Sequence, residues 1–167
     1  MPEQRSDDPQ GLAERLYDTH GPSLFRYAVM LLADPCAAED AVQQVFCMLL
    51  QPGRINAVKE HAHYLRRAVR NQCYSTLRQR QARGSEVSDA TLLEPLAAEP
   101  VAPDERVALE RAIRTLSADQ REVVHLHVFE GFTFQEIADA SNESINTVAG
   151  RYRYALKHLR NHLAELS

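Results

Sequence analysis

The chain has 167 residues and a formal net charge of −4, with 44% hydrophobic and 25% charged residues. That length suits one ordinary domain or two small ones, and the composition is typical of a soluble globular protein. Apolar runs fall short of the roughly 20 residues that a membrane span needs, and the polar start lacks a signal-peptide core, so we expect no membrane insertion. Three cysteines without CxxC spacing favour neither a disulfide framework nor a zinc knuckle, which predicts a cytoplasmic location.

Charge is strongly segregated along the chain. Residues 61–83 hold six arginines and no acid, whereas residues 84–105 hold six acids and no base. Residues 144–167 hold four bases and one acid. Two basic blocks on either side of an acidic connector say more about partners than the net charge does.

The first half of the chain predicts three helices. The first covers residues 9–33, with a kink or restart expected where Gly21 and Pro22 interrupt it. Asp34 and Pro35 predict the cap and first turn of a second helix, whose apolar residues recur at helical spacing as far as Leu49. Residues 51–59 predict a connector, and residues 60–83 a third helix whose arginines lie largely away from its apolar face.

The second half follows a stretch, residues 84–103, whose prolines, small residues and acids predict a link with little fixed structure. A helix is expected over residues 104–115. Capping boxes at 117–120 and 133–136 then open two helices, the first reaching about residue 130 before Gly131 and the second about residue 140. Residues 141–143 predict a tight turn with Asn142 in the left-handed region, and Ser144 caps a last helix that reaches about Leu166.

The two helices joined at residues 141–143 have the plan of a helix-turn-helix. Ile137, Ala138, Ile145 and Val148 are expected to hold the crossing. The remaining polar and small positions are then expected to approach a major groove: Asn146, Thr147, Gly150, Arg151 and Tyr154. Further cations are placed near phosphates: Arg153, Lys157 and Arg160. The alternative is an ordinary helical hairpin with a solvated basic face.

Two other helices carry candidate surfaces. The arginine-rich helix has Tyr64 and Tyr74 among its cations, a combination that suits unpaired bases as well as phosphates. The second helix turns Asp40, Gln43 and Gln44 outward while its apolar residues face inward, which suits docking on a protein. In both cases the alternative is a plain solvated helix face.

Catalytic and metal-binding constellations are not evident. The histidines of His61-x-His63 and His125-x-His127 lie two residues apart on predicted helices, so the members of each pair point in different directions. The sequence has no Gly-rich phosphate loop, serine elbow or obvious carboxylate pair. We therefore expect no metal, no cofactor and no enzyme activity; a metal-dependent hydrolase using the histidines is the alternative.

Five motifs in order resemble the extracytoplasmic-function (group IV) sigma factors of bacterial RNA polymerase. In the first half they are Ala38–Phe46, similar to the family's Glu-Asp-x-x-Gln-Glu-x-Phe, and Tyr64–Asn71, similar to Trp-Leu-x-x-x-Ala-Arg-Asn. In the second half they are Leu116–Val123, Gly131–Ala138 and the Thr147–Arg151 segment of the last helix. The resemblance covers about residues 12–83 and 104–165.

This resemblance implies an all-α fold of two small helical domains, residues 10–83 and 104–167, joined by a flexible acidic linker over 84–103. It implies a sigma factor that binds RNA polymerase core, through the β′ clamp helices and the β subunit, and directs promoter recognition and melting. An anti-sigma factor is a further implied partner. A stand-alone helix-turn-helix regulator that never docks on polymerase is the alternative, and it would need only the second domain.

The resemblance also assigns residues to three surfaces. The polymerase-binding set is Glu39, Asp40, Gln43 and Gln44. The set facing the minus-ten element is Tyr64, Arg67, Arg70, Asn71 and Tyr74. The minus-thirty-five set is Asn146, Thr147, Gly150, Arg151, Arg153, Tyr154 and Lys157. The acidic linker is implied to thread into the RNA-exit path of polymerase.

The chain departs from the family pattern at several of these positions. Gln44 stands where an acid is common, which weakens the docking charge, and Tyr64 replaces a frequent tryptophan. The other departures are Ser75, Asn142, Ala149 and Gly150. With small residues on the reading helix, base readout is expected to depend on Asn146, Thr147 and Arg151 and on DNA shape.

Overall fold

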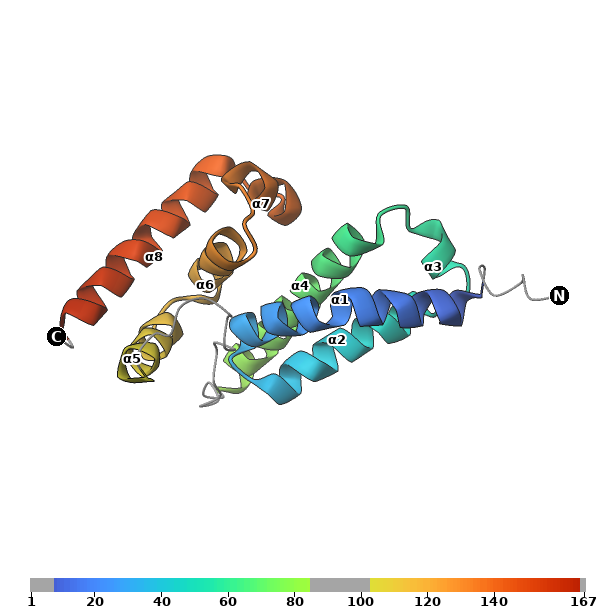
Figure 1. The fold of residues 1–167 in the computed structure, drawn as a ribbon, viewed down its shortest axis with the longest axis horizontal. Coiled ribbons are helices and arrows are strands. Elements are labelled where there is room, and N and C mark those ends of the chain that lie inside the picture. Colours follow the sequence, from blue (N-terminus) through green and yellow to red (C-terminus); the bar gives the residue numbers. More distant parts are fainter. Residues whose placement is uncertain (1–7, 85–102, 166–167) are drawn as a thin grey trace. The chain divides into compact units, whose positions relative to one another are not determined.

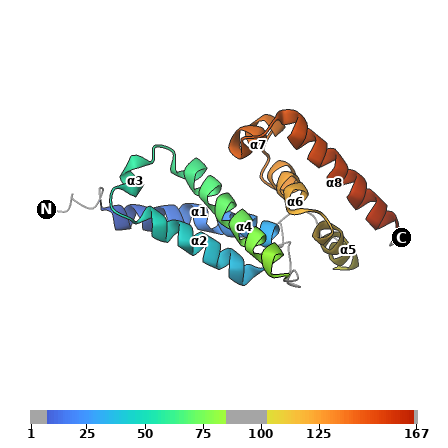
Figure 2. The same ribbon diagram turned by 180° about the vertical axis from the view of Figure 1, so that it is seen from behind.

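The structure is a computed structural model that describes residues 8–84 and 103–165. Within these ranges every regular element is helical, which confirms the predicted all-α class. The chain divides into two compact units, one containing residues 8–84 and the other containing residues 103–165. Figures 1 and 2 show the helices of each unit from opposite sides. The predicted linker lies almost wholly outside the described residues.

Three helices build the first unit by packing against one another: α1 (Pro9–Leu32), α2 (Pro35–Leu49) and α4 (His61–Arg83). Each contributes an apolar stripe at helical spacing, which burial against the other two stabilises. The largest buried side chains of this core include Leu31 and Leu32 from α1, Val45 and Leu49 from α2, and Leu65, Val69 and Cys73 from α4. The apolar face predicted for the second helix is therefore confirmed.

Helix α1 does not restart at Pro22, which was one of the two expected outcomes there. Pro22 lies inside a helix of 24 residues. A proline has no backbone N–H, so the carbonyl of Asp18 loses its hydrogen-bond donor within the helix. Asp18 is exposed, so water can donate to this carbonyl instead. Buried residues lie on both sides, Ala13 before and Leu24 after. Packing against α2 and α4 therefore holds the helix together across a residue that local preference would place in the first turn of a helix.

The junction between α1 and α2 is built as the sequence predicts, with one addition from α4. Asp34 accepts a hydrogen bond from the backbone N–H of Ala37 at 3.1 Å, and Pro35 occupies the first turn. The guanidinium of Arg80 reaches the same point from α4. It donates to the carbonyl oxygen of Leu32 at 2.9 Å and to Asp34 Oδ2 at 2.6 Å. One arginine of the basic block therefore joins three helices.

Replacement of Arg80 with alanine is expected to lower the free energy of unfolding of the first unit by about 1–3 kcal/mol, because a helix-end carbonyl and a carboxylate lose their donor. Both side chains are only 20–25% exposed, so solvent screens the pair incompletely. Urea unfolding of the full chain measures the change. Arg78→Ala is the matched control, since Arg78 is exposed on the same helix. An equal loss in both variants would contradict the role given to Arg80.

The predicted connector contains a short helix, α3 (Arg54–Ala57), that the sequence did not indicate. Gly53 precedes it with a φ of 78°, a conformation that favours glycine. Ile55 is 1% exposed, and its carbonyl oxygen lies 2.9 Å from Nε2 of His61. One buried side chain and one hydrogen bond therefore fix this connector against the start of α4.

The second unit contains α5 (Pro103–Arg114), α6 (Ala118–Val124), η1 (His125–Phe129), α7 (Phe134–Ser141) and α8 (Ile145–Glu165). Helix α8 is the longest of these and packs against α5, α6 and α7. The core is made of small and branched apolar side chains, among them Ala112, Ile113, Leu116, Val123, Ile137, Val148 and Ala155. The capping box of Ser117 and Gln120 opens α6 as predicted.

The predicted α-helix over 117–130 is correct only in its first part. From His125 to Phe129 the chain forms a π-helical turn, in which the Glu130 N–H donates to the His125 carbonyl at 3.2 Å. The N–H of Phe132 then donates to the Leu126 carbonyl at 2.9 Å, and Gly131 ends the element with a φ of 73°. The wider turn inserts one extra residue, and Val128 within it is 54% exposed.

Candidate nucleic-acid and protein interfaces

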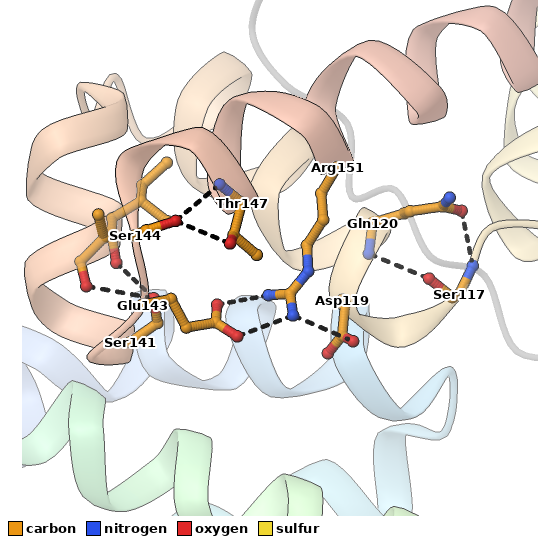
Figure 3. Close-up of polar contacts among 10 residues, drawn as sticks. Ser117, Asp119, Gln120, Ser141, Glu143, Ser144, Thr147 and Arg151 are labelled. Atoms are coloured by element: carbon orange, nitrogen blue, oxygen red, sulfur yellow. Dashed lines mark hydrogen bonds and ion pairs between the residues drawn. The ribbon is translucent and has the colours of Figure 1, made fainter.

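The turn between α7 and α8 is held by hydrogen bonds at both of its ends. Asn142 has a φ of 55°, and the N–H of Glu143 donates to the Ala138 carbonyl at 3.0 Å. On the α8 side, the hydroxyl oxygen of Ser144 accepts from the N–H of Thr147 at 3.1 Å (Figure 3). These bonds confirm the predicted left-handed turn and the predicted Ser144 cap. They fix the angle between the two helices of a helix-turn-helix.

The start of α7 is a reciprocal capping box. Thr133 Oγ1 accepts from the N–H of Glu136 at 3.2 Å, and Glu136 Oε2 accepts from the N–H of Thr133 at 2.7 Å. The Thr133 hydroxyl also donates to Glu136 Oε2 at 3.0 Å. These donors lower the pKa of Glu136, the backbone N–H being the largest cause. The box therefore stays intact as the pH falls, until the pH reaches this lowered pKa and the carboxylate is protonated.

Thr133→Ala is expected to raise the pKa of Glu136 toward its ordinary value, because the hydroxyl donor is lost while the backbone donor remains. The Glu136 side-chain resonance, followed by NMR through an acid titration, measures the shift. Thr133→Ser keeps a hydroxyl at the same place and is expected to leave the pKa low. A pKa that is the same in all three proteins would show that the hydroxyl does not interact with the carboxylate in solution.

Helix α8 has one buried face and one exposed polar face. Val148, Ala155 and Leu159 lie in the core. At about 100° per residue, the opposite face covers an arc of about 140°. It includes the exposed residues Asn146, Thr147, Arg153, Tyr154, Lys157 and Arg160, with the half-buried Gly150 among them. The structure thus brings six of the seven residues of the minus-thirty-five set onto one surface.

Arg151, the seventh of these residues, lies at the edge of this surface and is held by two acids. Its guanidinium makes a two-pronged contact with the Glu143 carboxylate, one prong being Nη2 to Oε1 at 2.7 Å. Nη2 also lies 3.6 Å from Oδ2 of Asp119, in the first turn of α6 (Figure 3). Arg151 therefore connects α8 to the turn and to α6.

Ile145 does not hold the helix crossing as predicted, because it is the first residue of α8 and is 43% exposed. A separate aromatic cluster joins the two helices to η1. The rings of His127, Phe134 and Tyr152 pack with centroids 4.5–5.2 Å apart, joining η1, α7 and α8. His127 Nδ1 lies 2.7 Å from the Phe132 carbonyl and, since a carbonyl only accepts, this nitrogen carries the hydrogen. The π-helical turn places this ring, and no local sequence signal indicates it.

The candidate minus-ten residues share one face of α4, opposite the buried Leu65, Val69 and Cys73. Arg67 and Asn71 are exposed, and Tyr64, Arg70 and Tyr74 are half-buried. The guanidinium carbon of Arg70 lies 4.6 Å from the centre of the Tyr74 ring, a cation–π distance. The five residues therefore place two cations, two aromatic rings and one amide on the same face.

The candidate polymerase-binding residues share one face of α2. Glu39, Asp40, Gln43 and Gln44 are all exposed, opposite a fully apolar face. The Gln43 amide donates to Glu39 Oε1 at 3.3 Å, and Gln44 Oε1 accepts from the Gln72 amide of α4 at 2.5 Å. Gln44 thus turns toward α4, which leaves Asp40 and Gln43 at the centre of the face.

The two histidines of the His125-x-His127 pair lie in different surroundings. His125 is 4% exposed, with its Nε2 atom 3.5 Å from Glu130 Oε1, while His127 belongs to the aromatic cluster. Within residues 8–84 and 103–165, His, Cys, Asp and Glu side chains form no group of three that could hold a metal ion. Over the same ranges, every helix is too short or too polar to cross a bilayer.

Comparison with known proteins places both units in one family. The family described as Sigma-70 region 2 matches residues 16–83, and the family described as Sigma-70, region 4 matches residues 106–159. Together they cover more than half of the chain, in the order and at the places where the motifs lie. The chain is therefore a sigma factor in which region 2 is followed by region 4.

Individual relatives indicate which group of sigma factors the chain belongs to. The chain is 29% identical over 160 residues to the ECF RNA polymerase sigma factor SigL of Mycobacterium tuberculosis, covering 93% of this chain and 90% of that protein. Its fold is similar to that of the sigma factor RpoE in a co-crystal with the anti-sigma factor NepR from Bartonella quintana (TM-score 0.71, 23% identity, 90% of this chain and 96% of that one). It is also similar to the fold of CnrH in complex with the cytosolic domain of CnrY (TM-score 0.63, 21% identity, 97% and 93%). The chain belongs to the sigma-70 family, in its extracytoplasmic-function group.

Proposed function

We propose that this sigma factor docks on RNA polymerase core through the exposed face of α2 and brings promoter DNA to α4 and α8. The observation that carries the proposal is the presence of both matched regions on one chain, each with an exposed polar face opposite its core. The domains would comprise residues 10–83 and 104–167. Docking would use the β′ clamp helices and the β subunit.

The face of α4 is suited to a melted minus-ten strand. Phosphates follow the cations Arg67 and Arg70, and an unpaired base can stack on Tyr64 or Tyr74. The exposed face of α8 is suited to the minus-thirty-five major groove, where Asn146 and Thr147 in its first turn reach base edges and Arg153 and Lys157 reach phosphates. Arg151, held by Glu143, orients this helix. Opening of the duplex would then draw on binding energy alone, so we propose no catalytic group in this chain.

A stand-alone regulator is the rival function. It would need only the helix-turn-helix, and it leaves the region 2 match without a purpose. A pull-down with purified core polymerase separates the two proposals, because a stand-alone regulator does not co-purify with core. Both proteins with similar folds were solved as complexes, RpoE with the anti-sigma factor NepR and CnrH with the cytosolic domain of CnrY. We propose that an inhibitory protein partner binds this chain too.

In vitro transcription tests the function directly. Core polymerase, the purified chain and a randomised promoter library are combined without any inhibitor, and the transcribed sequences are read. We expect transcripts that start downstream of one shared pair of elements. Transcription no different from that of core alone would refute the proposal.

A further inference from the structure

The exposed face of α8 has a gap in its side-chain cover at Gly150. Glycine is among the least favourable residues inside a helix, because the folded state loses its backbone freedom and gains no side-chain packing. Gly150 nevertheless lies well inside a helix of 21 residues. Helix preference therefore does not explain why a glycine stands at this position.

The fold itself does not require glycine at this position. A Cβ atom built on Gly150 meets nothing within 4 Å. Among the described residues, the glycines with left-handed φ angles are Gly53, Gly84 and Gly131, and Gly150 is not one of them. Neither packing nor backbone conformation explains the residue, so the reason lies in what approaches this face from outside.

The surroundings of Gly150 identify that approaching group. Its neighbours one turn before are Asn146 and Thr147, and one turn after are Arg153 and Tyr154; all four are exposed. Tyr154 is 68% exposed, the largest exposure of any large hydrophobic side chain described. Polar, cationic and aromatic side chains therefore surround a stretch of helix that has no side chain of its own. Such a surface is suited to contact with the edge of a base pair and the phosphates beside it.

We propose that Gly150 lets α8 approach the DNA closely and takes the 5-methyl group of a thymine against its Cα atom. The inference rests on the proposed function of α8. The helix backbone has its polar groups bonded within the helix, so the gap at Gly150 offers only C–H surface. The thymine methyl is the one apolar group that base pairs present in the major groove. Gly150 thus determines specificity because it has no side chain, which leaves its Cα atom open to the methyl group.

Gly150→Ala tests the approach, because its effects on the helix and on DNA binding have opposite signs. The probe is the promoter duplex that the wild-type holoenzyme selects from a randomised library. We expect the variant holoenzyme to bind it about tenfold more weakly, and Gly150→Leu more weakly still. In the full chain, amide hydrogens of α8 are expected to exchange about fivefold more slowly in Gly150→Ala, since alanine favours the helix.

Asn161→Ala is the matched control, since Asn161 is exposed farther along the same helix and alanine raises helix preference there too. Slower exchange with unchanged promoter affinity is expected. If Gly150→Ala binds the promoter as well as wild type or better, the inference is overturned. A wild-type holoenzyme that selects no sequence at all would refute the proposed function, and this inference with it.

Uracil substitution tests the methyl contact from the DNA side. Each thymine of the selected minus-thirty-five element is replaced in turn by uracil, which lacks only the methyl group. One position is expected to weaken wild-type binding several-fold and to have little effect on Gly150→Ala, where the close contact is already lost. If no position discriminates between the two proteins in this way, a thymine methyl does not lie at Gly150.

Discussion

Arg151→Ala is expected to weaken promoter binding by about 1–3 kcal/mol without changing its dependence on salt. Arg151 joins α8 to Glu143 in the turn and to Asp119 in α6, with 24% of its side chain exposed. Removing it leaves two carboxylates beside the DNA-facing end of α8, with no cation between them. The helix then loses its fixed angle, and the contacts of Asn146 and Thr147 with the bases weaken together.

The salt dependence separates this role from a phosphate contact. A cation that neutralises a phosphate releases counterions, whereas the charge of Arg151 is already balanced by two acids. Lys157→Ala is the control, because Lys157 is exposed on the same helix and is expected to lower the salt slope by about one. Fluorescence anisotropy of holoenzyme and promoter across a salt series measures both variants.

Arg151→Lys adds a geometric test. A lysine keeps the charge but cannot reproduce the two-pronged contact with Glu143, so we expect it to behave nearly as poorly as alanine. Full promoter affinity in the lysine variant, or a salt slope in Arg151→Ala that falls as much as in Lys157→Ala, would show that Arg151 acts on the DNA as a charge and not on the helix as a clamp.

Features that depend on neighbouring residues could be predicted from the sequence. The caps at Asp34, Ser117, Thr133 and Ser144 and the turn at Asn142 each involve atoms within a few residues of one another. The apolar stripes likewise predicted which face of each helix is buried, because helical periodicity alone decides it. Most candidate surface residues were placed correctly on exposed faces for the same reason.

Features that depend on distant residues could not be predicted. Arg80 belongs to the basic block by sequence, but it bonds to Leu32 and Asp34, almost 50 residues away. Arg151 was expected to face the groove, and only the fold shows the two acids beside it. Pro22 remains inside a helix because of tertiary packing that no local rule contains. The π-helical turn has no sequence signature, so the aromatic cluster that it positions was missed as well.

Asp40→Arg combined with Gln43→Ala is expected to weaken binding to core polymerase by at least about 2 kcal/mol, or roughly 30-fold. Asp40 and Gln43 lie at the centre of the exposed face of α2, while Gln44 is turned toward Gln72. A positive charge at the centre of a docking face leaves an unmatched group at the interface, and the lost amide removes a hydrogen-bonding partner. Both positions point away from the core, so far-UV circular dichroism is expected to show unchanged helicity.

Asp18→Arg is the matched control, because it makes the same change of charge at an exposed position on α1 and not on α2. Titration of labelled sigma factor with core polymerase compares the two variants with wild type. We expect the α1 variant to bind like wild type, since exposed charges far from an interface act only through a screened field. If both variants lose affinity equally, core senses the total charge of the unit and the docking face is not on α2. If neither does, docking uses another surface.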